Sequence, residues 1–222
     1  MKTHLSFPVR FLVIAMFLCA SFALGQELKP LSLPAPQTDG GKPLMQVLRD
    51  RHSTREFSSA KIPAQVLANM LWAAFGVNRP QAERPGLGRT APSAKNWQET
   101  DVYVATAEGL YIYDAKGNKL DPVLAGDVRA MTGVQPFVKD APVNLIYVAD
   151  FAKTGDASAE DRDFYTAADT GVIAENVYLF CASEGLAVVV RGSVDRAALA
   201  KVMKLRPDQK IMLAQTVGYP KK

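Results

Sequence analysis

The chain has 222 residues, 48% of them hydrophobic, with 26 Lys and Arg against 22 Asp and Glu and a net charge of +4 at pH 7. This length and apolar content suit one folded domain with a substantial core, and they exclude a globally disordered chain. The small net charge is no nucleic-acid-binding signature, so no nucleic-acid partner is expected.

The N-terminus has the layout of a secretory signal peptide. Lys2 and Arg10 precede an uncharged, mostly apolar run of 14 residues from Phe11 to Leu24, and small residues at Ala23 and Gly25 offer a cleavage site. The run is shorter than the roughly 20 residues needed to span a bilayer, so an uncleaved anchor is the less favoured alternative. We therefore expect residues 1–25 to be removed and the protein to be exported, to the periplasm, with no membrane anchor.

Little side-chain chemistry remains in the mature chain. Its 197 residues carry 24 Lys and Arg against 22 Asp and Glu, one cysteine (Cys181) and one histidine (His52). These counts exclude an intramolecular disulfide and a zinc site built mainly from Cys and His. A Ser-His-Asp triad is disfavoured, because the one histidine adjoins Ser53 in sequence, where side chains rarely face each other. Any chemistry is therefore not expected to be done by side chains alone.

Residues 26–42 contain several prolines and end near Gly40-Gly41, which is typical of an extended arm. Beyond the arm, helical apolar spacing with start and stop residues predicts helices over residues 43–51, 63–75, 159–184 and 195–205, with a short helix at 123–133. The second half of 159–184 is apolar nearly all round. This predicts a long helix buried in the core or against another subunit.

Five segments that alternate or run apolar, with β-branched and aromatic residues, predict strands. They are residues 101–106, 109–113, 143–149, 186–190 and 211–217. Residues 77–92 are expected to be a loop and residues 114–118 a turn. Helices and strands follow one another without regular β-α-β alternation, so we predict one α+β domain over residues 43–222, with helices packed on a mixed sheet.

A first cluster of candidate binding residues follows the first helix. Arg51, Ser53 and Arg55 alternate, so an extended backbone would place them on one face. Two guanidinium groups and a hydroxyl make a good phosphate receptor, because arginine binds phosphate oxygens in a bidentate manner. The alternative is a solvated basic helix end that is favourable to the helix dipole.

Two further clusters follow along the chain. Residues 89–98 crowd donors and acceptors around a Pro-Ser turn, which could address the polar edge of a planar heterocycle or be an ordinary polar turn. Arg191-Gly192 ends a predicted strand, where a glycine lets the backbone approach a ligand, although a plain strand-to-helix turn is the alternative. The GxGxxA match at 86–91 is rejected as a dinucleotide motif, because no strand precedes it and Pro92 follows it.

The three clusters together, in this order and spacing, resemble the FMN-dependent nitroreductase family, in a compact, exported form. RHSTREF at 51–57 is similar to the family's opening motif, and APSAKNWQ at 91–98 is similar to its Pro-Ser segment. The helical segment DTGVIAENVYL at 169–179 resembles the family's central helix, and VGYP at 217–220 resembles the family's closing motif.

The resemblance implies an FMN-dependent oxidoreductase, commonly a homodimer with the flavin at the subunit interface. It would transfer two electrons to a nitro, quinone or similar acceptor from an unknown donor; the alternative is a non-catalytic flavin-binding or structural relative. By position, Arg51 and Ser53, with His52 between them, would hold the FMN phosphate, and Arg55 would face the pyrimidine edge of the ring. The remaining residues implied in flavin binding are Pro92, Ser93, Ala94 and Asn96 along the ring and the backbone of Arg191 and Gly192. Lys221 and Lys222 could add a phosphate contact.

Overall fold

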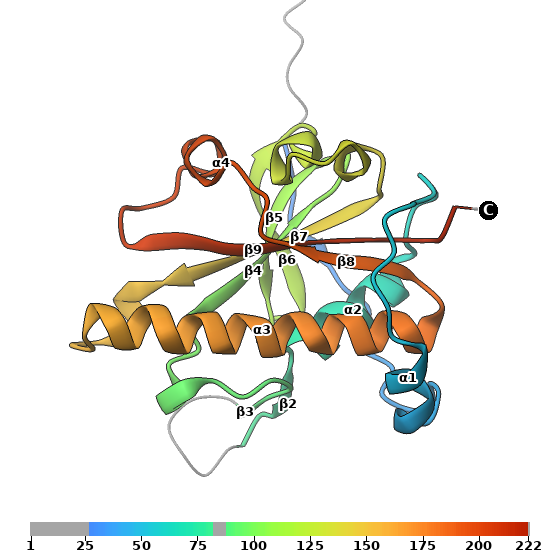
Figure 1. The fold of residues 1–222 in the computed structure, drawn as a ribbon, viewed down its shortest axis with the longest axis horizontal. Coiled ribbons are helices and arrows are strands. Elements are labelled where there is room, and N and C mark those ends of the chain that lie inside the picture. Colours follow the sequence, from blue (N-terminus) through green and yellow to red (C-terminus); the bar gives the residue numbers. More distant parts are fainter. Residues whose placement is uncertain (1–26, 82–87, 222) are drawn as a thin grey trace, which may run out of the picture.

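A seven-stranded sheet with the strand order β1-β6-β5-β4-β7-β9-β8 forms the centre of the fold (Figure 1). The computed structural model describes residues 27–81 and 88–221 of the chain. All neighbouring strands in this sheet pair in antiparallel fashion. The strands are β1 (Leu31–Ser32), β4 (Thr100–Ala105), β5 (Gly109–Asp114), β6 (Lys119–Ala125), β7 (Val143–Asp150), β8 (Ala187–Arg191) and β9 (Gln209–Gly218).

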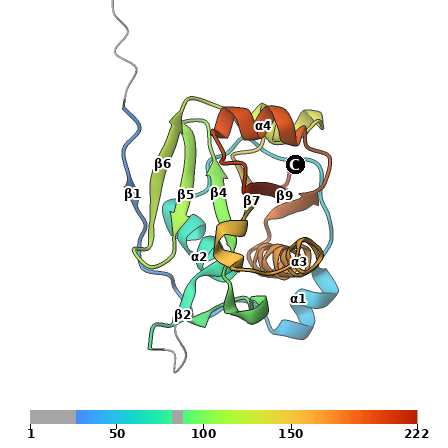
Figure 2. The same cartoon turned by 90° about the vertical axis from the view of Figure 1, so that its left-hand side faces the viewer.

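Helices cover both faces of this sheet, and their combination with antiparallel strands confirms the expected α+β class. α2 and α3 lie on one side and α4 lies on the other, as Figure 1 and the turned view in Figure 2 show. The shorter α1 packs against α3. The helices are α1 (Leu44–Asp50), α2 (Ala64–Phe75), α3 (Ala159–Glu184) and α4 (Arg196–Met203).

Alternate residues of the central strands feed two apolar clusters, one on each face of the sheet. On β4, Val102 and Val104 belong to the cluster beneath α2 and α3, whereas Tyr103 belongs to the cluster beneath α4. β7 is buried at all of its residues. This strand therefore shows a continuous apolar run in the sequence instead of alternation, as a strand covered on both faces should.

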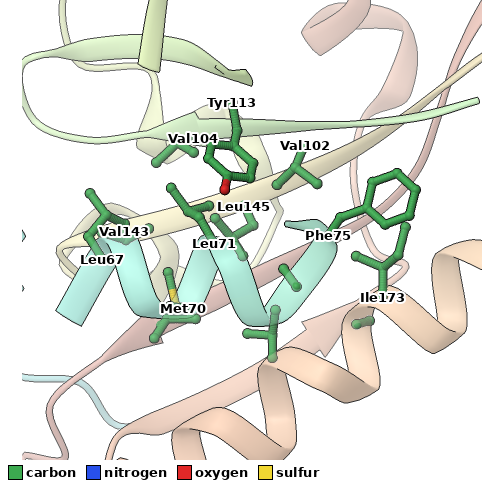
Figure 3. Close-up of a cluster of buried hydrophobic side chains, with 14 of the residues drawn as sticks. Leu67, Met70, Leu71, Phe75, Val102, Val104, Tyr113, Val143, Leu145 and Ile173 are labelled. Atoms are coloured by element: carbon green, nitrogen blue, oxygen red, sulfur yellow. The ribbon is translucent and has the colours of Figure 1, made fainter. Parts of the chain in front are cut away.

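The larger cluster forms where α2 and α3 meet the sheet (Figure 3). α2 contributes Leu67, Leu71 and Phe75 at helical spacing, and these side chains pack with Val104 of β4 and Ile173 of α3. Fully burying a side chain such as Leu71 stabilises the fold by about 1.5–3 kcal/mol.

α3 is the longest element, with 26 residues, and its ends have clear local causes. The Ser158 side chain accepts a hydrogen bond from the Asp161 N–H, which caps the first turn. Gly185 ends the helix in the left-handed conformation (φ 69°), and the Leu186 N–H donates to the Cys181 carbonyl as in a Schellman motif. One face of α3 is buried in the core, whereas Gly171 on the opposite face is exposed.

Two segments differ from the sequence-based expectation. Residues 123–133 do not form a helix: residues up to Ala125 complete strand β6, and only Arg129–Thr132 make a short 3-10 turn. Pro122 within β6 obscured this strand, but β1 pairs only with Lys119 and Leu120. Pro122 therefore lies where one edge of β6 needs no donor. The expected loop 77–92 contains a small antiparallel ribbon, β2 (Val77–Arg79) with β3 (Gly88–Arg89).

Residues 27–42 contain no helix, and this arm is tied to the domain at several points. β1 adds to the sheet edge beside β6. Further on, the Gln37 N–H donates to Asn69 Oδ1 (2.8 Å) and the Lys42 N–H donates to Ser183 Oγ (3.0 Å). The predicted signal peptide lies outside the described residues. Within residues 27–81 and 88–221, no helix is long and apolar enough to cross a bilayer.

Candidate functional site

The first cluster runs along the edge of the sheet. α1 ends at Asp50, Arg51 turns into an extended conformation (φ −60°, ψ 121°), and the Thr54 N–H donates to the Val188 carbonyl of edge strand β8 (2.8 Å). His52 is exposed, and its Nδ1 lies 2.7 Å from the Asp50 carbonyl, which accepts the hydrogen bond. The extended backbone on which the predicted alternation of Arg51, Ser53 and Arg55 depends is therefore present.

Arg51 and Ser53 are both in contact with one residue of the central helix, Tyr178. Ser53 Oγ lies 2.8 Å from the Tyr178 hydroxyl, and the same hydroxyl accepts a hydrogen bond from the Val190 N–H (2.9 Å). The Arg51 guanidinium carbon sits 5.3 Å from the centre of the Tyr178 ring, within the range of a cation–π contact. Nothing in the sequence pattern singled out this tyrosine.

Arg51 and Arg55 have no carboxylate partner among the described residues. Arg51 is half-buried and Arg55 is exposed. Arg51 and the Ser53 hydroxyl, which both contact Tyr178, could hold a phosphate group, because phosphate accepts charge-assisted hydrogen bonds from such donors. Arg55 is a second cation in the same segment.

The second cluster is a strained turn packed against α3. After exposed Pro92, the backbone takes the left-handed conformation at Lys95 (φ 52°), Asn96 (φ 56°) and Gln98 (φ 49°), which residues other than glycine rarely adopt. Gln98 donates from its amide side chain to Asn96 Oδ1 (2.8 Å). Such conformations persist only where surrounding contacts hold them, and they gather at functional sites.

Two carboxyl groups beneath this turn supply those contacts. The Ala94 N–H donates to Asp169 Oδ2 of α3 (2.8 Å), and Ser93 Oγ donates to Glu99 Oε2 (3.2 Å). Burial, followed by the negative charge of Asp169, raises the pKa of Glu99. Burial also raises the pKa of Asp169, against hydrogen bonds from Ala94, Ser93 and Glu99. Glu99 is the more buried of the two carboxyl groups, at 0% exposed against 8% for Asp169.

The third cluster places its arginine side chain inside the protein. Arg191 is only 4% exposed; Nη1 donates to the Thr132 carbonyl (2.7 Å), Nε to Thr216 Oγ1 (3.0 Å) and Nη2 to Asn144 Oδ1 (3.1 Å). All three partners are neutral, and burial lowers the pKa of Arg191 to about 10. The side chain therefore ties β8 to β7, β9 and the 129–132 turn. The backbone at Arg191 and exposed Gly192 is what this cluster can offer to a ligand.

The structure brings the first and third clusters together and leaves the second apart. Tyr178 links Ser53 to Val190, the residue before Arg191. The second cluster meets α3 at Asp169, nine positions before Tyr178, which is roughly 13.5 Å along the helix axis. Nine residues are about two and a half turns, so the two clusters lie on opposite sides of the helix.

The comparisons with known proteins agree with this fold. The model of the Nitroreductase family matches residues 48–219, so the chain belongs to the nitroreductase family. A candidate nitroreductase from Methanocaldococcus jannaschii is 31% identical over 170 residues, covering 73% of this chain and 85% of that protein.

Solved structures extend the comparison. A candidate nitroreductase from Ralstonia eutropha JMP134 is 43% identical with a TM-score of 0.83, covering 90% of this chain and 93% of the other. The NADPH:FMN oxidoreductase of Vibrio harveyi, solved with NAD+, has the same fold at 19% identity, with a TM-score of 0.59 over 81% of this chain and 69% of that one.

Proposed function

We propose that this nitroreductase-family oxidoreductase binds FMN non-covalently and passes two electrons to a nitro compound, a quinone or a similar small acceptor. The observation that carries the proposal is the segment from Arg51 to Arg55 along the edge of β8, where neither arginine has a carboxylate partner among the described residues and Ser53 adds a hydroxyl. The Vibrio harveyi relative, which is named for FMN, supports flavin as the cofactor.

The chain's own residues would bind and orient the cofactor. Arg51 would hold the phosphate through its guanidinium and Ser53 through its hydroxyl. Arg55 would place a positive charge at the pyrimidine edge of the ring, where it favours the anionic reduced form. The flavin supplies the redox chemistry when bound, which agrees with the absence of a His-based triad from the sequence. The ring would lie against Pro92, Ser93, Ala94 and Asn96 and against the backbone of Arg191 and Gly192.

We further propose a homodimer, because one chain presents the phosphate cluster and the ring-lining turn on opposite sides of α3. A second copy could bring its own turn to the phosphate cluster of the first. Exposed apolar residues are available for such an interface: Leu44 is 62% exposed and Met45 is 76% exposed on α1, and Val172 is exposed on α3. Light scattering of the processed protein should give about twice the chain mass, as a two-fold assembly requires. A monomer that binds FMN would contradict the dimer.

Flavin titration tests the phosphate site directly. Charge-assisted hydrogen bonds contribute roughly 1.5–3 kcal/mol each, so Arg51→Ala should weaken FMN binding by about ten- to a hundredfold. Riboflavin lacks the phosphate, so its affinity should barely change. Arg49→Ala is the matched control, because Arg49 is 75% exposed on α1 and, among the described residues, pairs only with its neighbour Asp50. Equal losses for FMN and riboflavin would show that Arg51 supports the fold instead of the phosphate.

A second measurement, on the FMN-loaded protein, distinguishes an oxidoreductase from the alternative, a flavin-binding relative without turnover. A reduced nicotinamide should bleach the flavin absorption, and a quinone or nitroaromatic acceptor should then restore it. Bound flavin that no donor reduces and no acceptor reoxidises would favour the non-catalytic reading. The physiological donor of an exported protein need not be a nicotinamide, so dithionite reduction followed by acceptor addition completes the test.

Export is proposed on the sequence of residues 1–25 alone. Intact-mass analysis of the protein from its native host should show a chain that begins after Gly25. A mature N-terminus at Met1 would contradict cleavage.

A further inference from the structure

We infer that Tyr178 is a positioning residue for the phosphate of the bound flavin, acting through Ser53 and Arg51; this inference rests on the proposed function. Tyr178 lies on α3, 125 positions from Ser53 in sequence, and is only 5% exposed. It would not touch the cofactor. Its effect would be to fix the two residues that do.

The hydrogen-bond directions at the Tyr178 hydroxyl follow from what its neighbours can do. The Val190 backbone N–H can only donate, so the phenol oxygen accepts at 2.9 Å and keeps its own proton. A phosphate oxygen can only accept, so it takes the proton of Ser53. Ser53 Oγ must then accept from the tyrosine at 2.8 Å. The result is a one-way chain from the Val190 N–H through Tyr178 and Ser53 to the phosphate.

This series of hydrogen bonds strengthens its last member, the bond from Ser53 to the phosphate. Each donor in a run of hydrogen bonds is polarised by the one before it, and the effect is larger in a partly buried site. The hydrogen bond to the Tyr178 hydroxyl also restricts the Ser53 side chain to one rotamer, so less conformational entropy is lost on binding. Ser53 without Tyr178 would remain a serine at the protein surface, with no preferred direction for its proton.

The tyrosine ring acts on the second phosphate ligand. The Arg51 guanidinium lies over the ring at 5.3 Å from its centre, and the arginine is half-buried there. A planar guanidinium stacked on an aromatic face is restrained in orientation, which suits bidentate binding. The hydrogen bond from the Thr54 N–H to the Val188 carbonyl (2.8 Å) holds the backbone directly after Ser53 against β8. One side chain of the central helix therefore sets the geometry of both ligands.

The test compares FMN and riboflavin binding by the full processed chain of four proteins: wild type, Tyr178→Phe, Tyr178→Leu and Tyr103→Phe. Tyr178→Phe should lower FMN affinity by roughly tenfold and riboflavin affinity by less than about twofold, since only FMN reports on the phosphate. Tyr178→Leu also removes the ring and should lower FMN affinity further. Tyr103→Phe is the matched control, because it removes another buried tyrosine hydroxyl, in the apolar cluster on the opposite face of the sheet from Tyr178. It should leave the FMN-to-riboflavin ratio unchanged.

The outcomes separate this inference from the proposed function. If wild type binds neither flavin, the proposed function is wrong and the inference falls with it. If wild type prefers FMN but Tyr178→Phe keeps the same preference, the inference alone is wrong. A Ser53→Ala background gives the second readout: there Tyr178→Phe should cost FMN binding less than about twofold, because the chain of hydrogen bonds is already broken. A tenfold loss of FMN affinity in the Ser53→Ala background would overturn the proposed series of hydrogen bonds.

Discussion

Gly133 should be intolerant of even a methyl group, and the reason is a buried arginine. Its backbone is extended (φ 177°), so its conformation does not require glycine. A Cβ at this position would, however, collide with Nη1 of Arg191. The guanidinium cannot swing aside freely, because it is buried and donates to Thr132, Asn144 and Thr216. Gly133→Ala must therefore break at least the 2.7 Å bond from Nη1 to the Thr132 carbonyl.

The expected cost follows from that bond. A hydrogen bond to a charged group contributes roughly 1.5–3 kcal/mol, so Gly133→Ala should lower the free energy of unfolding by about 2–3 kcal/mol. Urea unfolding followed by tryptophan fluorescence measures this, with an unchanged m value as the sign that only stability moved. Gly192→Ala is the control, because a Cβ there meets no atom within 4 Å and should change stability by less than about 0.5 kcal/mol.

A double-mutant cycle decides whether Arg191 is the cause. Arg191→Met removes the guanidinium tip, so Gly133→Ala added to Arg191→Met should cost less than about 1 kcal/mol. The coupling between the two sites would then exceed about 1 kcal/mol. An equal cost in both backgrounds would refute the reasoning, because the glycine would then be needed for some other contact.

Three further predictions concern stability. Burial and the charge of Asp169 raise the pKa of Glu99, so the native state binds a proton more tightly than the unfolded state, and stability should fall as pH rises above the unfolded pKa of about 4.3. Urea unfolding at several pH values should show wild type losing stability relative to Glu99→Gln, and parallel curves would contradict this. Gly185→Ala should lower the unfolding free energy by about 1 kcal/mol and Gly185→Asn by less, because φ at this position is 69° and asparagine tolerates the left-handed region. Equal losses in urea unfolding would point away from backbone strain. Leu71→Ala should lower the free energy of unfolding by about 2–5 kcal/mol, whereas Leu31→Ala, at an exposed position, should lower it by less than about 0.5 kcal/mol. Similar losses in urea unfolding would place Leu71 outside the core.

Local signals decided which elements the sequence could predict. The bounds of α3 were predicted because Ser158 before the helix and Gly185 after it act within one turn of the chain. β6 was not predicted, because its strand conformation depends on pairing with β5 and β1, and Pro122 locally argues against a strand. The expected helix at 123–133 failed for the same reason.

The candidate site divides along the same line. Arg51, Ser53 and Arg55 stand close together in sequence, so their alternation predicted a shared function. Tyr178 and the Glu99–Asp169 pair were missed, because each acts on a segment that the fold alone brings near. The inward turn of the Arg191 side chain was equally hidden, since all three of its acceptors are distant in sequence.

The position of β9 in the sheet has a consequence for how the chain folds. β9 is the last strand along the chain, yet it lies between β7 and β8 and pairs with both. Until residues 209–218 are in place, β7 and β8 each lack their β9 neighbour, and open strand edges are prone to aggregation. The native sheet closes only when this last strand inserts, through contacts between segments far apart in sequence, and such contacts slow folding.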